Sequence, residues 1–324
     1  MAYDLSDFAK ENPDVAANWV DGSVDFCTVD GKLICKPLSV IKPVGLFYNS
    51  SMYTSDKDIK DMSMDEFMES LGDNKIAFQT AENGWTSALL LAALIGNEEG
   101  GADLLNNNTD EKLYDYTAEP FVNGVAKLQT LLENNASSNT IGAAYADAAN
   151  AFMSKNASII CNGSWMSTEF DAGSSDKWSN DFNGDDVKAT IYPGNIALTN
   201  ERNYGEFWVS NNATDEEKEA AEAFLTFRDS QEEIEALILA EGGTAPKLTY
   251  TDDFKNKLKE NRILSELSES MDENTKYVAP LGDIFPASVA DTEFGKLLPK
   301  LADGTLTPEE FCQELTKKAE EAKQ

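Results

Sequence analysis

The segment DGKLICKPLSVIKPVGLFYNSSMY, residues 30–53, carries the strongest indication of the fold. Asp30-Gly31 is a turn dipeptide between strand-forming residues, so a β-hairpin is expected over 24–35. VGLFYN, residues 44–49, is expected to form a second short strand. Pro37 and Pro43 stiffen the chain between these two pieces. The segment therefore predicts a hairpin and a strand joined by a bent, rigid connection.

Outward from this segment, short apolar runs alternate with longer runs at helical spacing. Two further sequence features mark helix starts, because Thr214 with Glu217 and Thr307 with Glu310 have the spacing of capping boxes. Alternation of helices and short strands predicts an α/β fold with helices layered on sheets. Strands are expected at 74–79 and 204–210, and helices at 84–97, 118–135, 213–230 and 307–324.

The composition excludes several classes of function. The 324 residues include 26 Lys and Arg against 58 Asp and Glu, a net charge of -32 that opposes binding to nucleic acid or anionic membranes. The absence of histidine removes Ser-His-Asp and Cys-His catalysis and most zinc sites. No apolar run approaches the length of a membrane span. The simplest interpretation is that the acidic residues lie on the surface, where they are solvated and keep the protein soluble.

Motifs for cofactors, metals and catalysis give no positive signal. A calcium loop fitted to SNDFNGDD, with Gly184 at its sixth position, places Thr190 where a bidentate Glu is required. No phosphate-binding or dinucleotide fingerprint occurs, so no cofactor is expected. A glycosidase needs a pair of catalytic carboxylates, but with so many Asp and Glu residues the sequence favours no particular pair.

The four cysteines are Cys27, Cys35, Cys161 and Cys312, and none forms a CxxC pair. Cys27 and Cys35 flank the expected hairpin turn. A three-residue loop would place them opposite one another, whereas a two-residue turn would offset them by one residue. The sequence leaves two alternatives open: a disulfide between Cys27 and Cys35, or four buried free thiols.

Two tryptophans lie at positions suited to ligand binding. Trp85 follows the polar residues TAEN, at the junction between an expected strand and an expected buried helix. Trp165 lies in NGSW at the end of another expected strand. In α/β sheets such strand ends line ligand sites. An indole offers a flat apolar face and one N–H donor, which suits a sugar ring beside Asn, Ser and Glu. Core packing is the alternative for either tryptophan.

Several motifs resemble those of the extracellular solute-binding proteins of ABC importers, family 1, the maltose-binding type. The DGK hairpin followed by a strand ending in Tyr48-Asn49 is similar to the family's first crossing. AFMSKNASIICNGSW, residues 151–165, resembles the pattern aFxxGkaaMxxxGxW, with Asn156 in place of the usual Gly. YGEFWVS followed by ATDEEKEAAEAFLTF, and the ending DGTLTPEEFCQEL, also resemble family segments.

The resemblance implies a two-lobe, periplasmic-binding-protein-like (type II) α/β fold whose lobes are joined by hinge strands and close around a solute. The first lobe is expected to comprise 1–39 and 206–270, and the second 40–205 and 271–324. The hinge strands would be 37–48 and 204–210.

The resemblance also implies function. The protein is expected to bind a carbohydrate, of oligosaccharide size, in an interlobe cleft for delivery to a membrane ABC permease, and to perform no chemistry on it. The expected location is extracellular, at the cell surface or periplasmic, with any signal peptide or lipid anchor outside this chain. A glycan-acting enzyme or a non-transport surface protein on the same fold is the alternative. The expected ligand-binding residues are Trp165, Trp85, Asn83, Glu82, Tyr204 and Glu206.

The chain begins at a point that resembles the middle of the family's first lobe. At least two βα units of that lobe would then be absent, which implies an incomplete first lobe with unpaired strand edges. Two explanations are open: the sequence is truncated, or a complementing chain or an oligomer supplies the missing segment.

Overall fold

The computed structural model describes residues 2–109, 111–205 and 207–323. The chain divides into two compact units. Unit 1 comprises Met1–Pro43 and Asn200–Ser265, and unit 2 comprises Val44–Thr199 and Glu266–Gln324. The chain therefore passes between the units after residues 43, 199 and 265, where the sequence-based division had its boundaries after residues 39, 205 and 270.

Unit 2 is built on a four-stranded mixed sheet in the order β4-β5-β3-β6. The parallel pair is β4 (Ile76–Ala77) with β5 (Ile159–Asn162), while β3 (Gly45–Asn49) runs antiparallel to both β5 and β6 (Val187–Thr190). All four residues of β5 are buried, as expected for a strand covered on both faces. A second, parallel pair joins β7 (Ile196–Leu198) to β8 (Lys276–Val278).

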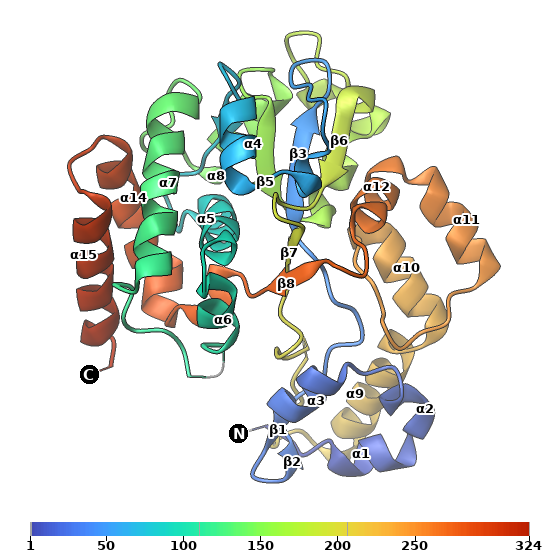
Figure 1. The fold of residues 1–324 in the computed structure, drawn as a ribbon. Helices are drawn as coiled ribbons and strands as arrows, with labels where there is room; N and C mark the ends of the chain where they lie inside the picture. Colours follow the sequence, from blue (N-terminus) through green and yellow to red (C-terminus); the bar gives the residue numbers. More distant parts are fainter. Residues whose placement is uncertain (1, 110, 206, 324) are drawn as a thin grey trace. The chain divides into compact units, whose positions relative to one another are not determined.

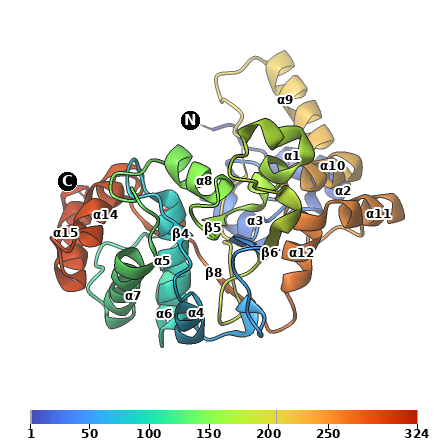
Figure 2. The same ribbon diagram turned by 90° about the horizontal axis from the view of Figure 1, so that it is seen from above.

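The centre of unit 2 is helix α5 (Trp85–Asn97), in which 11 of 13 residues are buried. Figures 1 and 2 show α7 (Glu119–Asn135) between α5 and α15 (Pro308–Glu321), with α14 (Phe294–Ala302) beside α15. An apolar helix with both sides covered is what the run SALLLAALI predicts. The other α-helices among the described residues of unit 2 are α4 (Met64–Ser70), α6 (Gly101–Asn106), α8 (Tyr145–Met153) and α13 (Leu281–Ile284).

Unit 1 is mostly helical in its described residues. Its first chain segment forms α1 (Ser6–Glu11), α2 (Pro13–Ala16) and α3 (Asp21–Cys27), followed by the hairpin of β1 (Thr28–Val29) and β2 (Lys32–Leu33). Its second chain segment forms α9 (Asp215–Arg228), α10 (Gln231–Glu241) and α11 (Asp252–Glu260); α12 (Arg262–Ser270) spans the last division.

A buried polar network joins the two chain segments of unit 1. The Asp229 carboxylate is completely buried as a side chain and accepts hydrogen bonds from Trp19 Nε1 at 2.8 Å and Ser39 Oγ at 2.6 Å. Lys36 Nζ lies 3.0 Å from Asp229 Oδ1 and completes a buried ion pair. The apolar residues Leu5, Phe8, Val209 and Leu225 form a core cluster of the same unit.

The hairpin prediction is confirmed around its turn. Thr28 pairs with Leu33 and Val29 with Lys32, and Asp30 and Gly31 have φ of 51° and 75°, as a type I′ turn requires. The predicted strand at 24–27 is wrong, because these residues belong to α3. Ser23 is buried in α3, where its hydroxyl accepts from Leu38 N at 2.7 Å and donates to Asn203 O. Tertiary hydrogen bonds thus outweigh local strand propensity.

The strand predicted at 204–210 is also wrong for the residues described. Tyr204 and Ser210 form only isolated bridges, to Pro37 and Ala2 respectively. Within this segment the backbone pairs with two different partners: Phe207 O accepts from Lys36 N, and Val209 O accepts from Tyr3 N. Because the partner changes and Pro37 has no N–H to donate, no continuous ladder forms.

Candidate ligand-binding site

The carboxyl ends of two parallel strands bring Trp85 and Trp165 together in unit 2. Ile76 of β4 is in register with Ile159 of β5, so both strands end at one edge of the sheet. After β4 the chain crosses a short loop and enters α5 at Trp85; after β5 it turns through Gly163 to Trp165. The two indole centroids lie 6.2 Å apart with an interplanar angle of 41°.

Tyr145, the first residue of α8, adds a third ring to this pair. Its centroid lies 5.4 Å from that of Trp85 at 35°. Trp165 is 40% exposed, and Trp85 and Tyr145 are half-buried. Core rings are closed off from water, whereas these three keep accessible surface. We call Trp85, Tyr145 and Trp165 the aromatic platform.

Residues beside the platform fix the orientation of its rings. A Cβ added at Gly163 would lie 2.1 Å from Cη2 of Trp165, so the indole folds back over the glycine and no larger residue fits beneath it. The buried Asn162 amide donates to the Tyr145 hydroxyl at 3.2 Å and accepts from Gly163 N at 2.8 Å. One amide at the end of β5 therefore bonds both to Tyr145 of the platform and to the glycine beneath Trp165.

Glu82 and Asn83 lie in the loop between β4 and α5. The buried Gln79 amide donates to Glu82 Oε2 at 3.2 Å and accepts from Thr86 N at 3.3 Å. Glu82 Oε2 also accepts from Tyr145 N at 3.2 Å, which ties the loop to α8. Gly84, with φ of 65°, permits the left-handed turn into α5. The loop thus presents one carboxylate and one amide beside three aromatic rings.

The structure brings four of the predicted site residues together: Trp85, Trp165, Glu82 and Asn83. Tyr204 lies in unit 1, half-exposed, in an aromatic group with Phe26 and Trp208 at centroid distances of 6.3 and 4.8 Å. Its role in binding stays a prediction. Glu206 lies outside the described residues.

Sequence reasoning missed Tyr145 and Gln79. Tyr145 is the first residue of α8. The sequence indicates where this helix begins and ends, but it does not indicate which of its residues contacts Trp85. Gln79 carried a usable signal, because a polar residue at the end of an apolar strand is either exposed or committed to hydrogen bonds.

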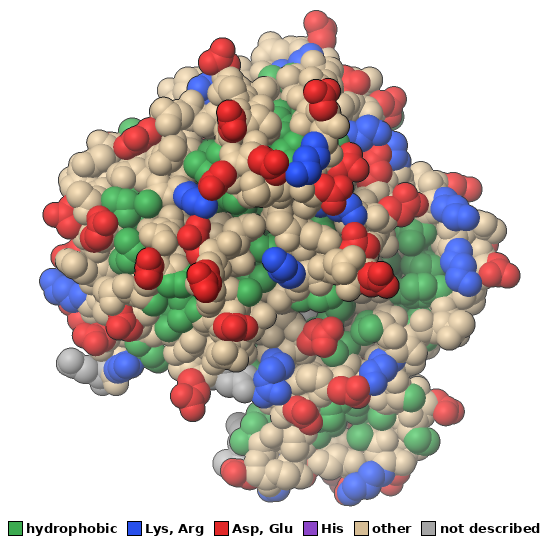
Figure 3. Space-filling model, viewed as in Figure 1, with side chains coloured by type: hydrophobic (Ala, Val, Ile, Leu, Met, Phe, Trp, Pro, Cys, Tyr) green, Lys and Arg blue, Asp and Glu red, His purple; other side chains and the backbone are tan. Residues whose placement is uncertain are grey.

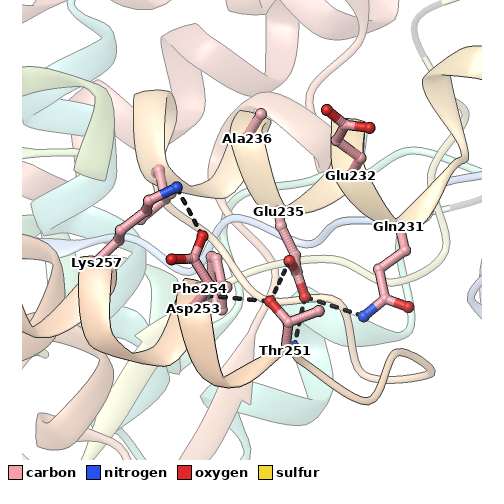
Figure 4. A pocket seen from close by; sticks show the side chains of 9 residues that line it. Gln231, Glu232, Glu235, Ala236, Thr251, Asp253, Phe254 and Lys257 are labelled. Carbon is pink, nitrogen blue, oxygen red and sulfur yellow. Dashed lines mark hydrogen bonds and ion pairs between the residues drawn. The ribbon is translucent and has the colours of Figure 1, made fainter.

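Two pockets lie outside the platform. One, of about 560 Å³, lies between α10 and α11 of unit 1 (Figure 4), and the other, of about 330 Å³, lies in unit 2 and is lined by Phe78 and by polar and small residues of 137–156. Neither is lined by the platform. In the first pocket the buried Glu235 carboxylate accepts from Thr251 N and Oγ1, each at 2.7 Å. This carboxylate is committed to the start of α11 and is not free for a ligand.

On the face shown in Figure 3, Asp and Glu side chains are scattered and interspersed with Lys and Arg. Within the described ranges, no group of three or more His, Cys, Asp or Glu side chains is placed to hold a metal ion. Polar groups and aromatic faces are therefore the chemistry that the platform offers to a ligand.

Residues 1–261 match the family described as "Bacterial extracellular solute-binding protein". The chain belongs to this family. No curated protein that was compared matches it. Helices in the described part of the chain all fall short of the length and apolarity needed to cross a bilayer.

Solved structures show the same fold. A chitin oligosaccharide binding protein superimposes with a TM-score of 0.77 at 19% identity, covering 99% of this chain and 78% of that one. A Streptococcus pneumoniae solute-binding protein in complex with the blood group A-trisaccharide gives 0.72 at 18% identity, covering 98% and 78%. RafE in complex with raffinose gives 0.66 at 18%, covering 100% and 80%. The fold class is therefore the two-lobe α/β fold of solute-binding proteins.

Proposed function

We propose that this solute-binding protein binds a carbohydrate, of oligosaccharide size, and that the aromatic platform is part of its site. The observation that carries the proposal is the grouping of Trp85, Tyr145 and Trp165 beside Glu82 and Asn83. Sugars present apolar C–H faces that pack on aromatic rings and hydroxyls that bond to carboxylate and amide groups.

The structural neighbours support the same ligand class and size, because the names of several refer to chitin oligosaccharide, a blood group trisaccharide, raffinose or maltose. Membership of the family supports delivery of the bound sugar to a membrane ABC permease from the extracellular side.

A ligand screen tests the proposal. Purified protein is melted alone and with chito-oligosaccharides, raffinose, maltose and maltotriose, and hits are confirmed by calorimetry. A ligand at 100 times its Kd stabilises the folded protein by about 2.7 kcal/mol. Monosaccharides, amino acids and polyamines serve as the comparison set. Binding confined to amino acids or polyamines would overturn the carbohydrate assignment.

The same samples separate binding from catalysis. After overnight incubation, chromatography of the sugar should return it unchanged, because a binding protein performs no chemistry on its ligand. Appearance of shorter sugars in proportion to protein concentration would instead favour a glycan-acting enzyme on this fold.

A further inference from the structure

The two cysteines of unit 1 lie in direct contact. Cys27 Sγ and Cys35 Sγ are 3.0 Å apart, and the residues are only 1% and 2% exposed. Cys161 lies in β5 and Cys312 in α15, both in unit 2, and each is buried in the apolar core. The first pair is therefore placed for a reaction between two sulfurs, and the other two thiols provide an internal comparison.

The hairpin register alone would not put these sulfurs together. Its two-residue turn pairs Thr28 with Leu33, and Ile34 N donates to Cys27 O at 3.0 Å, so Cys27 faces Ile34 and is offset from Cys35 by one residue. In regular strands such neighbours point to opposite faces. Cys27, however, is the last residue of α3, and the helical backbone turns its side chain toward Cys35.

We propose that Cys27 and Cys35 form an intramolecular disulfide in the extracellular protein. The family is extracellular by description, and disulfides form and persist in oxidising compartments. The bond closes the segment 27–35, which links the end of α3 to the chain entering the Lys36–Asp229 network.

The reaction is a thiol–disulfide exchange. The Cys27 thiolate attacks a low-molecular-weight disulfide and releases one thiolate, and the Cys35 sulfur then displaces the second from the mixed disulfide. The chain loses two thiol protons and two electrons, and the small disulfide is reduced to two thiols. Because both sulfurs are buried in the folded unit, the exchange takes place while the hairpin is still open.

The surroundings tolerate the loss of both thiol hydrogens. The main nearby acceptor, Lys36 O, already receives Gly205 N at 2.8 Å, so oxidation leaves no buried carbonyl without a donor. In the folded, reduced unit the hydrogen bond from Cys35, together with Ser23 and despite burial, lowers the pKa of Cys27 to about 7. Burial raises the pKa of both Cys161 and Cys312 to about 12.

Thiol mapping tests the proposal directly. The full chain is refolded in a mixture of reduced and oxidised glutathione, denatured, alkylated without reductant and digested. The expected result is alkylation of Cys161 and Cys312 alone, with a linked peptide pair containing Cys27 and Cys35 that separates on reduction. Four alkylated cysteines, or linkage of either cysteine only to a second chain, would overturn the proposal.

Melting provides a second readout. Reductant should lower the melting temperature of the refolded protein by roughly 5 °C or more, because a disulfide removes freedom from the unfolded chain. The variant Cys27→Ala/Cys35→Ala should melt at one temperature with or without reductant. A refolded wild-type protein whose melting is equally insensitive to reductant would contradict a stabilising bond.

Discussion

The indole rings of Trp85 and Trp165 lie 6.2 Å apart because β4 and β5 run parallel and end at one edge of the sheet. Trp165 is the more exposed of the two. Its removal by Trp165→Ala is expected to weaken sugar binding at least about tenfold, since one aromatic contact contributes roughly 0.5–1.5 kcal/mol beyond its buried area. Calorimetry with the best sugar from the screen measures this.

The control for this substitution is Trp178→Ala in the same unit. Trp178 packs against Phe182, which is not a platform ring, and donates from Nε1 to Glu169 O. It should lower stability and leave affinity unchanged. Equal affinities of wild type and Trp165→Ala would remove Trp165 from the site.

Gly163→Ala probes the orientation of Trp165 without removing its ring. The new Cβ would collide with the indole at 2.1–2.5 Å, and the exposed indole can swing away. The expected result is a loss of affinity close to that of Trp165→Ala with a much smaller loss of stability. Gly173→Ala is the matched control, because nothing lies within 4 Å of its Cβ position. Wild-type affinity in Gly163→Ala would show that the ring orientation seen here is not needed.

Gln79→Leu tests a positioning residue that lies behind the loop. It removes the donor to Glu82 and the acceptor of Thr86 N, leaving a buried N–H without a partner, which costs roughly 1–3 kcal/mol. Both stability and affinity are expected to fall. Gln79→Glu keeps an acceptor for Thr86 N but sets a carboxylate against Glu82, so it should retain more stability and still lose affinity. Full affinity in both variants would argue against a role of the loop in binding.

Much of the platform could be predicted because its parts are local. Gly163-Ser164-Trp165 after a strand, and Asn83-Gly84-Trp85 before an apolar helix, mark strand ends in the sequence itself. Tyr145 could not be predicted, because its contact with Trp85 depends on how α8 packs on the sheet edge. Local sequence patterns predict where a helix or strand begins. Which of its faces contacts which neighbouring element depends on tertiary packing, which these patterns do not describe.

In unit 1, two segments differ from the structure that their local sequence predicts. Residues 24–27 have strand-forming composition but complete α3, and 204–210 has the alternation of a strand but pairs with two different segments. In both places contacts between distant parts of the chain override local preference. The turn at Asp30-Gly31 was predictable because its φ angles are a property of those two residues.

Asp229→Asn is expected to destabilise unit 1 strongly. The substitution keeps the shape of the side chain but leaves Lys36, 8% exposed as a side chain, without a counter-charge. Breaking a buried pair in this way costs about 3–5 kcal/mol. Urea unfolding measures it. Asp7→Asn is the control, because its pair with Lys10 is exposed and such pairs contribute roughly 0–1 kcal/mol. Equal midpoints for the two variants would contradict the network's role.

The stabilising effect of Glu235 should depend on pH in a defined direction. Burial alone would raise the pKa of this carboxyl, but hydrogen bonds from the backbone and side chain of Thr251 and from Gln231 lower it below its ordinary value. The folded state therefore binds fewer protons than the unfolded state. The contribution is complete above the ordinary pKa of glutamate, about 4.3, and is lost as the pH falls through the lowered folded-state value.

Unfolding free energies of wild type and Glu235→Gln should consequently differ at pH 7 and converge as the pH falls below about 4. Glutamine keeps an acceptor for Thr251 N, but its NH2 group replaces the oxygen that accepts from Thr251 Oγ1, so the variant removes the charge and one accepted hydrogen bond. Glu232→Gln, an exposed position on the same helix, is the control substitution. A wild-type advantage that stays constant from pH 7 into acid would mean that the shape of Glu235, and not its charge, holds Thr251 at the start of α11.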